Sequence, residues 1–320
     1  MGKVRHVVYC GDAKYVPIIG ISMMSVVWNN PGEQLCFHLL LEGIRQEDSD
    51  RLGRFYALYR NVAEIHVHCI PADCPEMKVF QGVKSPYSVA VNYRLLLPRL
   101  LGEDIGEVLY LDGDVICQQS LAPLWQEPLT NEEWVAGVAD PMEAMHRKRT
   151  GLAAYINSGV LRMNLDAWRQ EHIREKALAF YEAADFLGYP DQDAVNFLCA
   201  GHIRPMRREY NFPAACNFAL AGVPGYIPAE ARLVHFVGPV AKPWQVICLD
   251  SRAALWERFK GCSFWFDMPV EGGTDVMAAT EMRAIRQLLA QGEEHPAYER
   301  YCALLKKLGC QFHPALFIRR

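Results

Sequence analysis

The chain has 320 residues, of which 51% are hydrophobic, and it carries a formal net charge of −4. This length and apolar content suffice for one large α/β domain or two smaller ones with a substantial core. The slightly acidic charge gives no basic face for nucleic acid, so no nucleic-acid partner is expected. Eleven cysteines, with no pair spaced as Cys-x-x-Cys, indicate a reducing compartment rather than a disulfide framework.

Nothing in the sequence reads as a membrane span or a secretory signal. The first apolar run, 6–10, is too short for a signal peptide, and no stretch approaches the roughly 20 residues of a transmembrane helix. We therefore expect a cytoplasmic protein.

The first third of the chain alternates apolar runs with amphipathic stretches, which favours a mostly parallel sheet covered by helices on both faces. Ligands of such sheets bind at the carboxyl ends of the strands, and Asp12 follows the first strand directly. In chain order we expect a strand at 4–10, a helix at 15–28, a strand at 35–41, a helix at 47–58, a strand at 63–70 and a helix at 88–101 that contains Arg94.

The apolar run 108–117 delivers two carboxylates, Asp112 and Asp114, separated by Gly113. Side chains alternate along an extended chain, so the two acids face the same way. Two hard oxygen donors of this kind suit Mg²⁺ or Mn²⁺. Asp-Gly-Asp is also common in polar turns, and the run by itself leaves both interpretations open.

The middle of the chain adds a strand at 134–139 that delivers Asp140. The polar segment 141–154, with three consecutive basic residues, is predicted to be an irregular solvated loop that could form one wall of a cleft. Beyond it we expect a strand at 157–165, which Asn157 and Ser158 enter, and helices at 168–184 and 194–199.

Two later motifs combine a structural and a chemical interpretation. Asp191 is suited to an N-cap and Asp193 to the first helical turn, and neither role excludes catalysis. His235 ends an apolar strand, a position typical of a hydrogen-bonded core histidine. The Gly238 and Lys242 that follow would suit a phosphate-bearing ligand, because backbone N–H groups and an ammonium can face its oxygens.

One further set has the residue types of a zinc site. His66, His68, Cys69 and Cys74 lie close in sequence, but no second cysteine pair follows at the spacing of a zinc finger. Core and surface positions are the favoured explanation of these residues.

Taken together, the ordered motifs resemble the retaining glycosyltransferases of family 8. Bacterial members of that family build the outer core of lipopolysaccharide from UDP-galactose or UDP-glucose. The resemblance covers about 4–244, and its motifs here are Tyr110 to Asp114, Asn157 to Val160, Asp191 to Asp193, and His235 to Trp244. In this chain three residues separate Gly238 from Lys242, where the family usually has two.

The resemblance implies a GT-A type fold, a Rossmann-like, mostly parallel sheet flanked by helices, and a bound Mn²⁺, with Mg²⁺ as the alternative. It further implies a UDP-hexose donor and a saccharide or glycolipid acceptor. The implied metal ligands are Asp112, Asp114 and His235. On the donor, Asp12 would bind the uridine, Gly238 and Lys242 would bind the diphosphate, and Arg94 and Asp112 would approach the sugar nucleotide. The transferred sugar would contact Asn157, Ser158, Asp191 and Gln192, and Asp140 would lie on the acceptor side.

The chemistry of such a site centres on charge. A cation would stabilise the departing UDP, and Asp191 or Gln192 would stabilise the oxocarbenium-like carbon. Because an amide is a poor nucleophile, we favour attack of the acceptor on the same face as the leaving group over a covalent intermediate on Gln192. A loop at 238–244 would exclude water.

Two other functions are weighed against this one. A nucleotidyltransferase would need a glycine-rich phosphate loop near the N-terminus, which 11–14 does not provide. A nucleotide-sugar-binding protein without catalysis would not need the complete set of metal ligands together with Asp191 and Gln192.

The predicted domain organisation is a GT-A catalytic domain at 1–265 and a helical C-terminal extension at 266–320. We expect helices at 278–290 and 296–308 in the extension. The favoured interpretation is an appendage packed on the catalytic domain. The alternative is a basic amphipathic surface, including Arg319 and Arg320, in peripheral contact with the inner face of the cell membrane.

Overall fold

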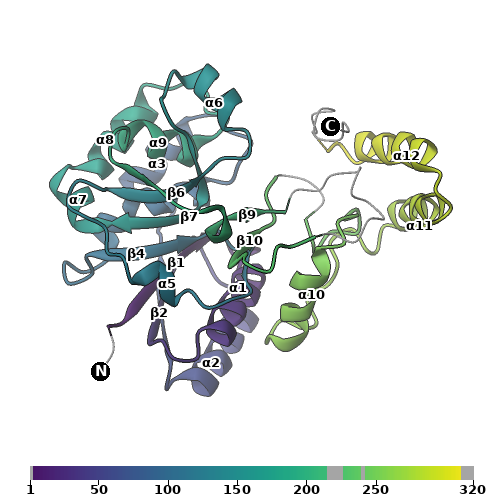
Figure 1. Cartoon of the computed structure of the whole chain (residues 1–320), viewed down its shortest axis with the longest axis horizontal. Helices are drawn as coiled ribbons and strands as arrows, with labels where there is room; N and C mark the ends of the chain where they lie inside the picture. The colour runs from purple at the N-terminus through teal and green to yellow at the C-terminus, as the bar shows by residue number, and fades with distance from the viewer. Residues whose placement is uncertain (1–2, 215–225, 239–241, 311–320) are drawn as a thin grey trace.

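A computed structural model describes residues 3–214, 226–238 and 242–310. It contains a seven-stranded sheet of order β3-β2-β1-β4-β7-β6-β8 and a three-stranded sheet of order β5-β10-β9. Helices cover both faces of the large sheet (Figure 1). Its strands are β1 (Arg5–Gly11), β2 (Leu35–Leu41), β3 (Ala63–Cys69), β4 (Glu107–Leu111), β6 (Val135–Ala139), β7 (Ile156–Asn164) and β8 (Ile203–Pro205); the small sheet has β5 (Val115–Cys117), β9 (Phe212–Pro213) and β10 (Leu233–His235).

Short connections join these strands to helices of mostly three turns or fewer. The helical elements are α1 (Val16–Asn29), α2 (Gln46–Tyr59), α3 (Pro75–Gly82), η1 (Val89–Leu96), α4 (Leu97–Leu100), α5 (Ala122–Trp125), α6 (Glu143–Thr150), α7 (Leu165–Gln170), α8 (Ile173–Glu182), α9 (Pro190–Leu198), η2 (Arg208–Tyr210), α10 (Ala253–Cys262), α11 (Val276–Ala290) and α12 (Glu294–Lys307).

The predicted α/β fold is confirmed, with one strand reversed. Strands β3, β2, β1 and β4 are parallel, whereas β7 runs antiparallel to both β4 and β6. The start of β7 therefore lies at the carboxyl end of β4. The N–H of Asp112 donates to the carbonyl of Gly159 at 2.8 Å, which continues the pairing past the end of β4.

Alternate side chains of each strand enter cores on opposite faces of the sheet. Val7 and Leu109 belong to a core that includes α1, α2 and α10, whereas Val8 and Tyr110 belong to a core that includes η1, α8 and α9. The sheet is therefore buried on both sides, as expected of parallel strands.

One local prediction is wrong, and two predicted helices are each divided into two shorter ones. The segment 141–154 is not a loop, because it contains α6, whose last turn carries Arg147, Lys148 and Arg149 before Gly151 at φ 76°. Basic residues followed by a left-handed glycine are a normal helix ending. The helix expected at 88–101 is the 3-10 helix η1 followed by α4, and that expected at 168–184 is broken at His172, whose φ is 53°.

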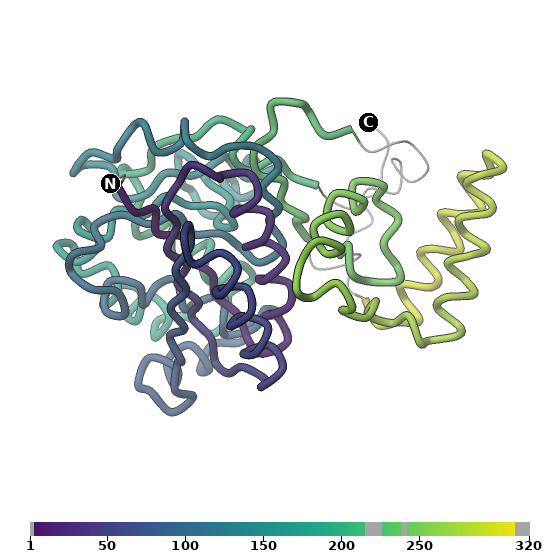
Figure 2. The backbone as a smooth tube through the Cα atoms, turned by 90° about the horizontal axis from the view of Figure 1, so that it is seen from below, coloured from purple at the N-terminus to yellow at the C-terminus, as the bar shows by residue number. Residues whose placement is uncertain are grey.

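The C-terminal helices form a separate small core. Helices α11 and α12 pack on each other and on Ile247, close to the predicted bounds, and lie at the end of the molecule farthest from the large sheet (Figures 1 and 2). Trp265 belongs to the core under α1. Residues 311–320, including Arg319 and Arg320, lie outside the described residues. Among the helices that are described, none has the length and apolarity needed to cross a membrane.

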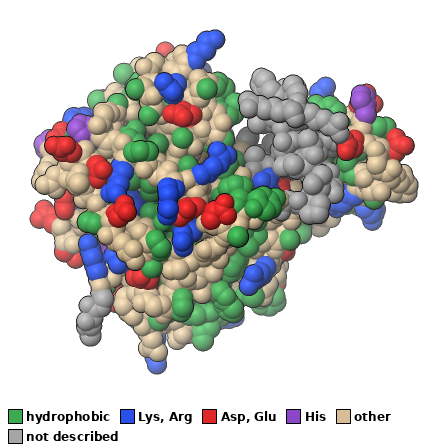
Figure 3. All heavy atoms as spheres, viewed as in Figure 1, with side chains coloured by type: hydrophobic (Ala, Val, Ile, Leu, Met, Phe, Trp, Pro, Cys, Tyr) green, Lys and Arg blue, Asp and Glu red, His purple; other side chains and the backbone are tan. Residues whose placement is uncertain are grey.

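Acidic and basic side chains are interspersed on the face of the sheet-bearing part drawn in Figure 3. Among the surface ion pairs of the described residues, Arg204 lies 2.7 Å from Glu127. Exposed pairs of this kind contribute about 0–1 kcal/mol each, so the buried cores dominate stability.

Gly20, in the middle of α1, is predicted to be intolerant of any side chain. A Cβ at this position would lie 2.1 Å from Cζ3 of the buried Trp265 ring. Gly20→Ala should lower the free energy of unfolding by about 1–3 kcal/mol, the usual cost of overpacking, as measured by urea denaturation. Gly53→Ala is the matched control, because nothing lies within 4 Å of its Cβ. Equal stability of Gly20→Ala and wild type would contradict the prediction.

Candidate active site

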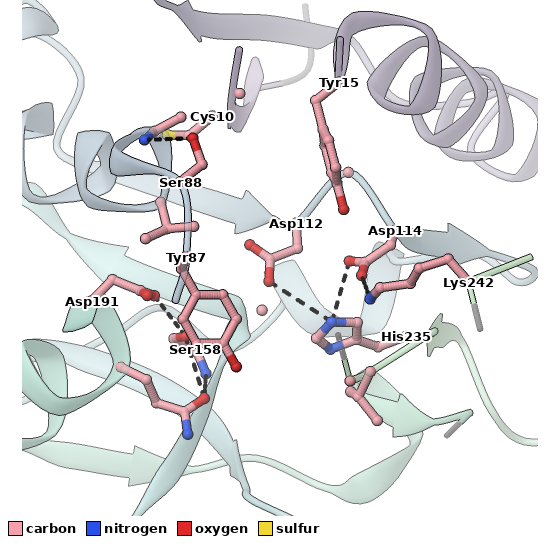
Figure 4. Close-up of a pocket in the computed structure, with 18 of the residues that line it drawn as sticks. Cys10, Tyr15, Tyr87, Ser88, Asp112, Asp114, Ser158, Asp191, His235 and Lys242 are labelled. Atoms are coloured by element: carbon pink, nitrogen blue, oxygen red, sulfur yellow. Dashed lines mark hydrogen bonds and ion pairs between the residues drawn. The ribbon is translucent and has the colours of Figure 1, made fainter. Parts of the chain in front are cut away.

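A cleft of about 1010 Å³ opens at the carboxyl ends of β1 and β4. The structure brings almost all of the sequence-predicted site residues to its wall (Figure 4). The predicted residues that line it are Asp12, Arg94, Asp112, Asp114, Asn157, Ser158, Asp191, Gln192, His235, Gly238 and Lys242. Asp140 is not a lining residue; its Oδ2 lies behind Asn157 Nδ2 at 3.1 Å and Gln192 Nε2 at 3.2 Å.

The three predicted metal ligands converge on one point. His235 pairs with Val115 across the small sheet, which places its ring beside the carboxylates that flank Gly113. Its Nε2 is 3.3 Å from Asp114 Oδ1 and 3.8 Å from Asp112 Oδ2, and one donor atom from each residue lies within 4.8 Å of the others. Two carboxylates and one imidazole fit a divalent cation such as Mn²⁺.

The ring of His235 is oriented by Asn211, which sequence reasoning missed. His235 Nδ1 is 3.0 Å from Asn211 Oδ1. An amide oxygen can only accept, so Nδ1 donates to it and Nε2 faces the two carboxylates, where it would be a ligand to a bound metal ion. Asn211 Nδ2 in turn donates to Asn157 Oδ1 at 2.9 Å. A single asparagine in a loop gives no sequence signal for this role.

Lys242 pairs with Asp114, one of the three predicted metal ligands. Its Nζ donates to Asp114 Oδ2 and, at 2.6 Å, to the carbonyl of Phe236. Burial by itself would raise the pKa of Asp114, but the Lys242 ammonium and the His235 ring outweigh it and hold that pKa below its usual range. Asp114 is therefore a charged carboxylate near neutral pH, the form that could bind a metal ion.

Arg94 links Asp112, one of the predicted metal ligands, to Asp191 across the cleft. Its side chain is 2% exposed, and its guanidinium contacts Asp112 Oδ1 at 2.8 Å and Asp191 Oδ2 at 3.1 Å. It also donates to the carbonyl of Ser158 at 2.6 Å and stacks on Tyr110, with Cζ 3.9 Å from the ring centroid. One buried cation thus fixes two carboxylates whose charges would otherwise repel.

Asp191 and Gln192 enter the cleft from the first turn of α9. Ser158 Oγ donates to Asp191 Oδ2 at 2.8 Å, and the Ser158 N–H donates to Gln192 Oε1 at 3.0 Å. The N-cap role predicted for Asp191 is wrong, because Tyr189 is the N-cap and α9 begins at Pro190. The side chain of Asp193 is directed away from the cleft and forms a bidentate salt bridge with Arg149, with N–O distances of 2.9 and 2.6 Å.

Two turns line the cleft, one after β1 at Asp12 and one after β10 at Gly238. Asp12 Oδ1 accepts the N–H groups of Lys14 and Tyr15 at 2.9 and 3.1 Å, which fixes the turn between β1 and α1. Gly238 has a φ of 95°, a left-handed conformation that favours glycine. The loop predicted to close at 238–244 includes 239–241, which lie outside the described residues.

Comparisons with known proteins agree with this geometry. The sequence profile described as Glycosyl transferase family 8 matches residues 6–248. The chain is 28% identical over 251 residues to the lipopolysaccharide 1,3-galactosyltransferase of Salmonella typhimurium strain LT2, and 29% identical over 259 residues to the lipopolysaccharide 1,2-glucosyltransferase of Escherichia coli K12. Each alignment covers 75% of this chain and 72% of the relative.

A solved structure has a similar fold. The crystal structure of galactosyltransferase LgtC, in complex with donor and acceptor sugar analogues, superposes with a TM-score of 0.66 at 25% identity. The match covers 81% of this chain and 96% of that one. Since the family profile spans well over half of the sequence and the expected motifs meet in one cleft, this chain belongs to glycosyl transferase family 8.

Proposed function

We propose that the protein is a retaining, Mn²⁺-dependent hexosyltransferase that moves glucose or galactose from a UDP-sugar to a saccharide acceptor, such as a lipopolysaccharide core. The observation that carries the proposal is the convergence of Asp112, Asp114 and His235 opposite Asp191 and Gln192 in one cleft. Relatives that transfer galactose and glucose are almost equally similar in sequence, so both hexoses remain in the proposal.

The metal end of the cleft would bind the diphosphate. Mn²⁺ held by Asp112, Asp114 and His235, with Mg²⁺ as the alternative, would neutralise the negative charge that develops on UDP as its bond to the sugar breaks. Lys242 and the backbone of Gly238 would bind the same oxygens. In the proposed binding mode, Lys242 exchanges its contact with Asp114 for one with the diphosphate.

The uridine would bind beside Asp12 and the transferred sugar beside Asn157 and Ser158. Arg94 would keep Asp112 aligned with the donor. Asp140, which accepts hydrogen bonds from Asn157 and Gln192, would act on the acceptor side through these two amides.

The orientation of Gln192 favours attack of the acceptor from the leaving-group face. Its Oε1 already accepts the Ser158 N–H at 3.0 Å and Asn157 Nδ2 at 3.2 Å, so its lone pairs are directed to protein donors. Gln192 would then position the sugar, and the carboxylate of Asp191 would stabilise the positive charge on the anomeric carbon.

The part proposed at 1–265 would bind donor and acceptor and catalyse transfer, although Glu271, Gly309 and Cys310 of the extension also line the cleft. The extension at 266–320 would bring the enzyme to the inner face of the cell membrane. Lys306 and Lys307 in the last turn of α12 are exposed and could face anionic headgroups. A glycolipid acceptor would make this peripheral contact useful.

Removal of the metal tests the proposed function. UDP release from UDP-glucose or UDP-galactose should occur with Mn²⁺, be lost with EDTA, and return when Mn²⁺ is added in excess, as followed by a coupled UDP assay. Without an acceptor, slow donor hydrolysis is the expected signal. Absence of metal-dependent binding or hydrolysis for both donors would contradict the proposal.

The pH dependence of turnover tests the role of Asp191. Burial raises the pKa of Asp191, and the charge of Asp112 adds to this effect against Arg94 and Ser158. The carboxylate is the form required, and it is present above its pKa. Turnover should therefore fall, as the pH is lowered, at a pH above the ordinary Asp pKa of about 3.9. The measurement is kcat against pH at saturating Mn²⁺, within the range where circular dichroism shows an intact fold; a flat profile would contradict this role.

A further inference from the structure

A second group of metal-ligating side chains lies on the edge of the large sheet, at the starts of β1, β2 and β3. We call it the strand-start cluster: His6, Cys36, His38, Glu64 and His66. The strands are in register, with His6 opposite Cys36, Cys36 opposite Glu64, and His38 opposite His66. Side chains at opposed positions of neighbouring strands project from the same face, so all five lie together. The candidate active site is at the other ends of these strands.

The donor atoms have the spacing of a metal site. His6 Nδ1 is 3.0 Å from His38 Nε2, and Cys36 Sγ is 3.4 Å from the same nitrogen. In a tetrahedral zinc site with the usual bond lengths, two nitrogens lie about 3.3 Å apart and a nitrogen and a sulfur about 3.5 Å apart. One donor atom from each of the three residues lies within 4.8 Å of the others.

A second hydrogen bond fixes the ring of His38, the most buried histidine of the cluster. His38 Nδ1 is 3.2 Å from Nε2 of His68, so it can donate its proton there and direct the lone pair of Nε2 to Cys36 and His6. A hydrogen bond at the second ring nitrogen is the usual support of a metal-bound histidine.

Two members of the cluster are buried in the sheet, since Cys36 and His38 are 3% and 4% exposed. By contrast, His66 and Glu64 are exposed on the edge strand β3, which leaves a route for an ion to enter.

We propose that His6, Cys36 and His38 bind one Zn²⁺ ion, with the fourth ligand from His66 or Glu64. The donor atoms of both residues lie within 4.8 Å of one another and of Cys36 Sγ. Binding breaks the S–H bond of Cys36, forms the Zn–S bond and releases that proton to solvent. A proton that lies between His6 Nδ1 and His38 Nε2 in the metal-free protein moves to Nε2 of His6, which leaves both facing nitrogens free to bind the ion. The ion would tie the edge strand β3 and its neighbour β2 to β1 and is independent of the proposed transferase chemistry.

Cobalt substitution tests this site directly. The full-length chain, stripped with chelator and kept reduced, is titrated with Co²⁺ while the thiolate-to-cobalt charge-transfer absorption is recorded. We expect the band to saturate at one equivalent and to be displaced by Zn²⁺. The triad of Asp112, Asp114 and His235 offers no sulfur, so the band should persist in Asp114→Ala.

Three variants show whether the cobalt band comes from this site or from another cysteine. Cys36→Ser and His6→Gln should abolish the band or weaken Co²⁺ binding at least tenfold, whereas Cys69→Ser, which removes an exposed cysteine of β3, should retain it. His6→Gln lies at the half-buried start of β1, so it tests the site even if Cys36→Ser fails to fold. No band in the wild type, or an unchanged band in His6→Gln, would overturn the proposal.

Discussion

Asp114→Asn should reduce metal-dependent sugar transfer by roughly 100-fold or more, because a metal ion supplies several kcal/mol of charge stabilisation to such reactions. The amide keeps the shape of the side chain and removes the charge that pairs with His235 and Lys242. The loss should appear in the rate of UDP release at fixed Mn²⁺ and be accompanied by a much higher Mn²⁺ concentration at half activation. Both quantities come from one titration of initial rate against Mn²⁺.

The control for this variant is Asp73→Asn, which removes the charge of an exposed turn residue and should leave the titration unchanged. Circular dichroism and the thermal midpoint verify that the Asp114 variant is folded. Normal turnover of folded Asp114→Asn at ordinary Mn²⁺ concentrations would sink the metal assignment while leaving family membership untouched.

Gly159→Ala is the second change with a large expected effect. A Cβ on Gly159 would lie 2.1 Å from His235 Cε1 and 2.8 Å from Asp112 Oδ2. No methyl group fits there, so the ring and the carboxylate must separate, and two of the three proposed metal ligands lose their mutual geometry. We expect a loss of activity similar to that of Asp114→Asn, together with weaker Mn²⁺ binding by calorimetry.

Gly53→Ala again serves as the matched control, because it adds the same methyl group where nothing lies within 4 Å. The double variant Gly159→Ala/His235→Ala distinguishes a clash from a backbone effect. If the clash with His235 is the cause, the loss of folding stability caused by Gly159→Ala should be smaller in the His235→Ala background than in the wild type, as measured by urea denaturation. Wild-type Mn²⁺ affinity in Gly159→Ala would show that the cleft tolerates the methyl group.

The alternation of apolar runs was sufficient to predict the sheet, since buried parallel strands are nearly continuous apolar segments. It could not predict that β7 is antiparallel, because strand direction depends on the path of the chain through α6 and not on the composition of the strand. The error at α6 has a local cause: its buried positions are few, with only His146 fully buried, so it lacks the apolar stripe on which helix prediction depends.

Nearly all of the site residues predicted from sequence line the cleft, whereas Asn211, which orients one of them, was not predicted. The carboxylates of Asp112 and Asp114 flank a glycine at the end of an apolar run, a pattern visible in a few letters. Asn211 is significant only because His235 lies 3.0 Å away.

The strand-start cluster was missed for the same reason. Its members come from three strands that are about 30 residues apart in sequence, and they meet only through the register of those strands. The set considered from sequence, His66, His68, Cys69 and Cys74, reflected closeness along the chain instead.

The contact between Lys242 and Asp114 has a consequence for the order in which ligands bind. With this internal counter-ion, the charge of Asp114 is already paired in the absence of a metal ion. A divalent cation bound at Asp114 would displace the ammonium, and the released lysine would become available to an anion in the same cleft. Cation and nucleotide should therefore bind with positive cooperativity, each strengthening the other by the same factor, with the cation loading first.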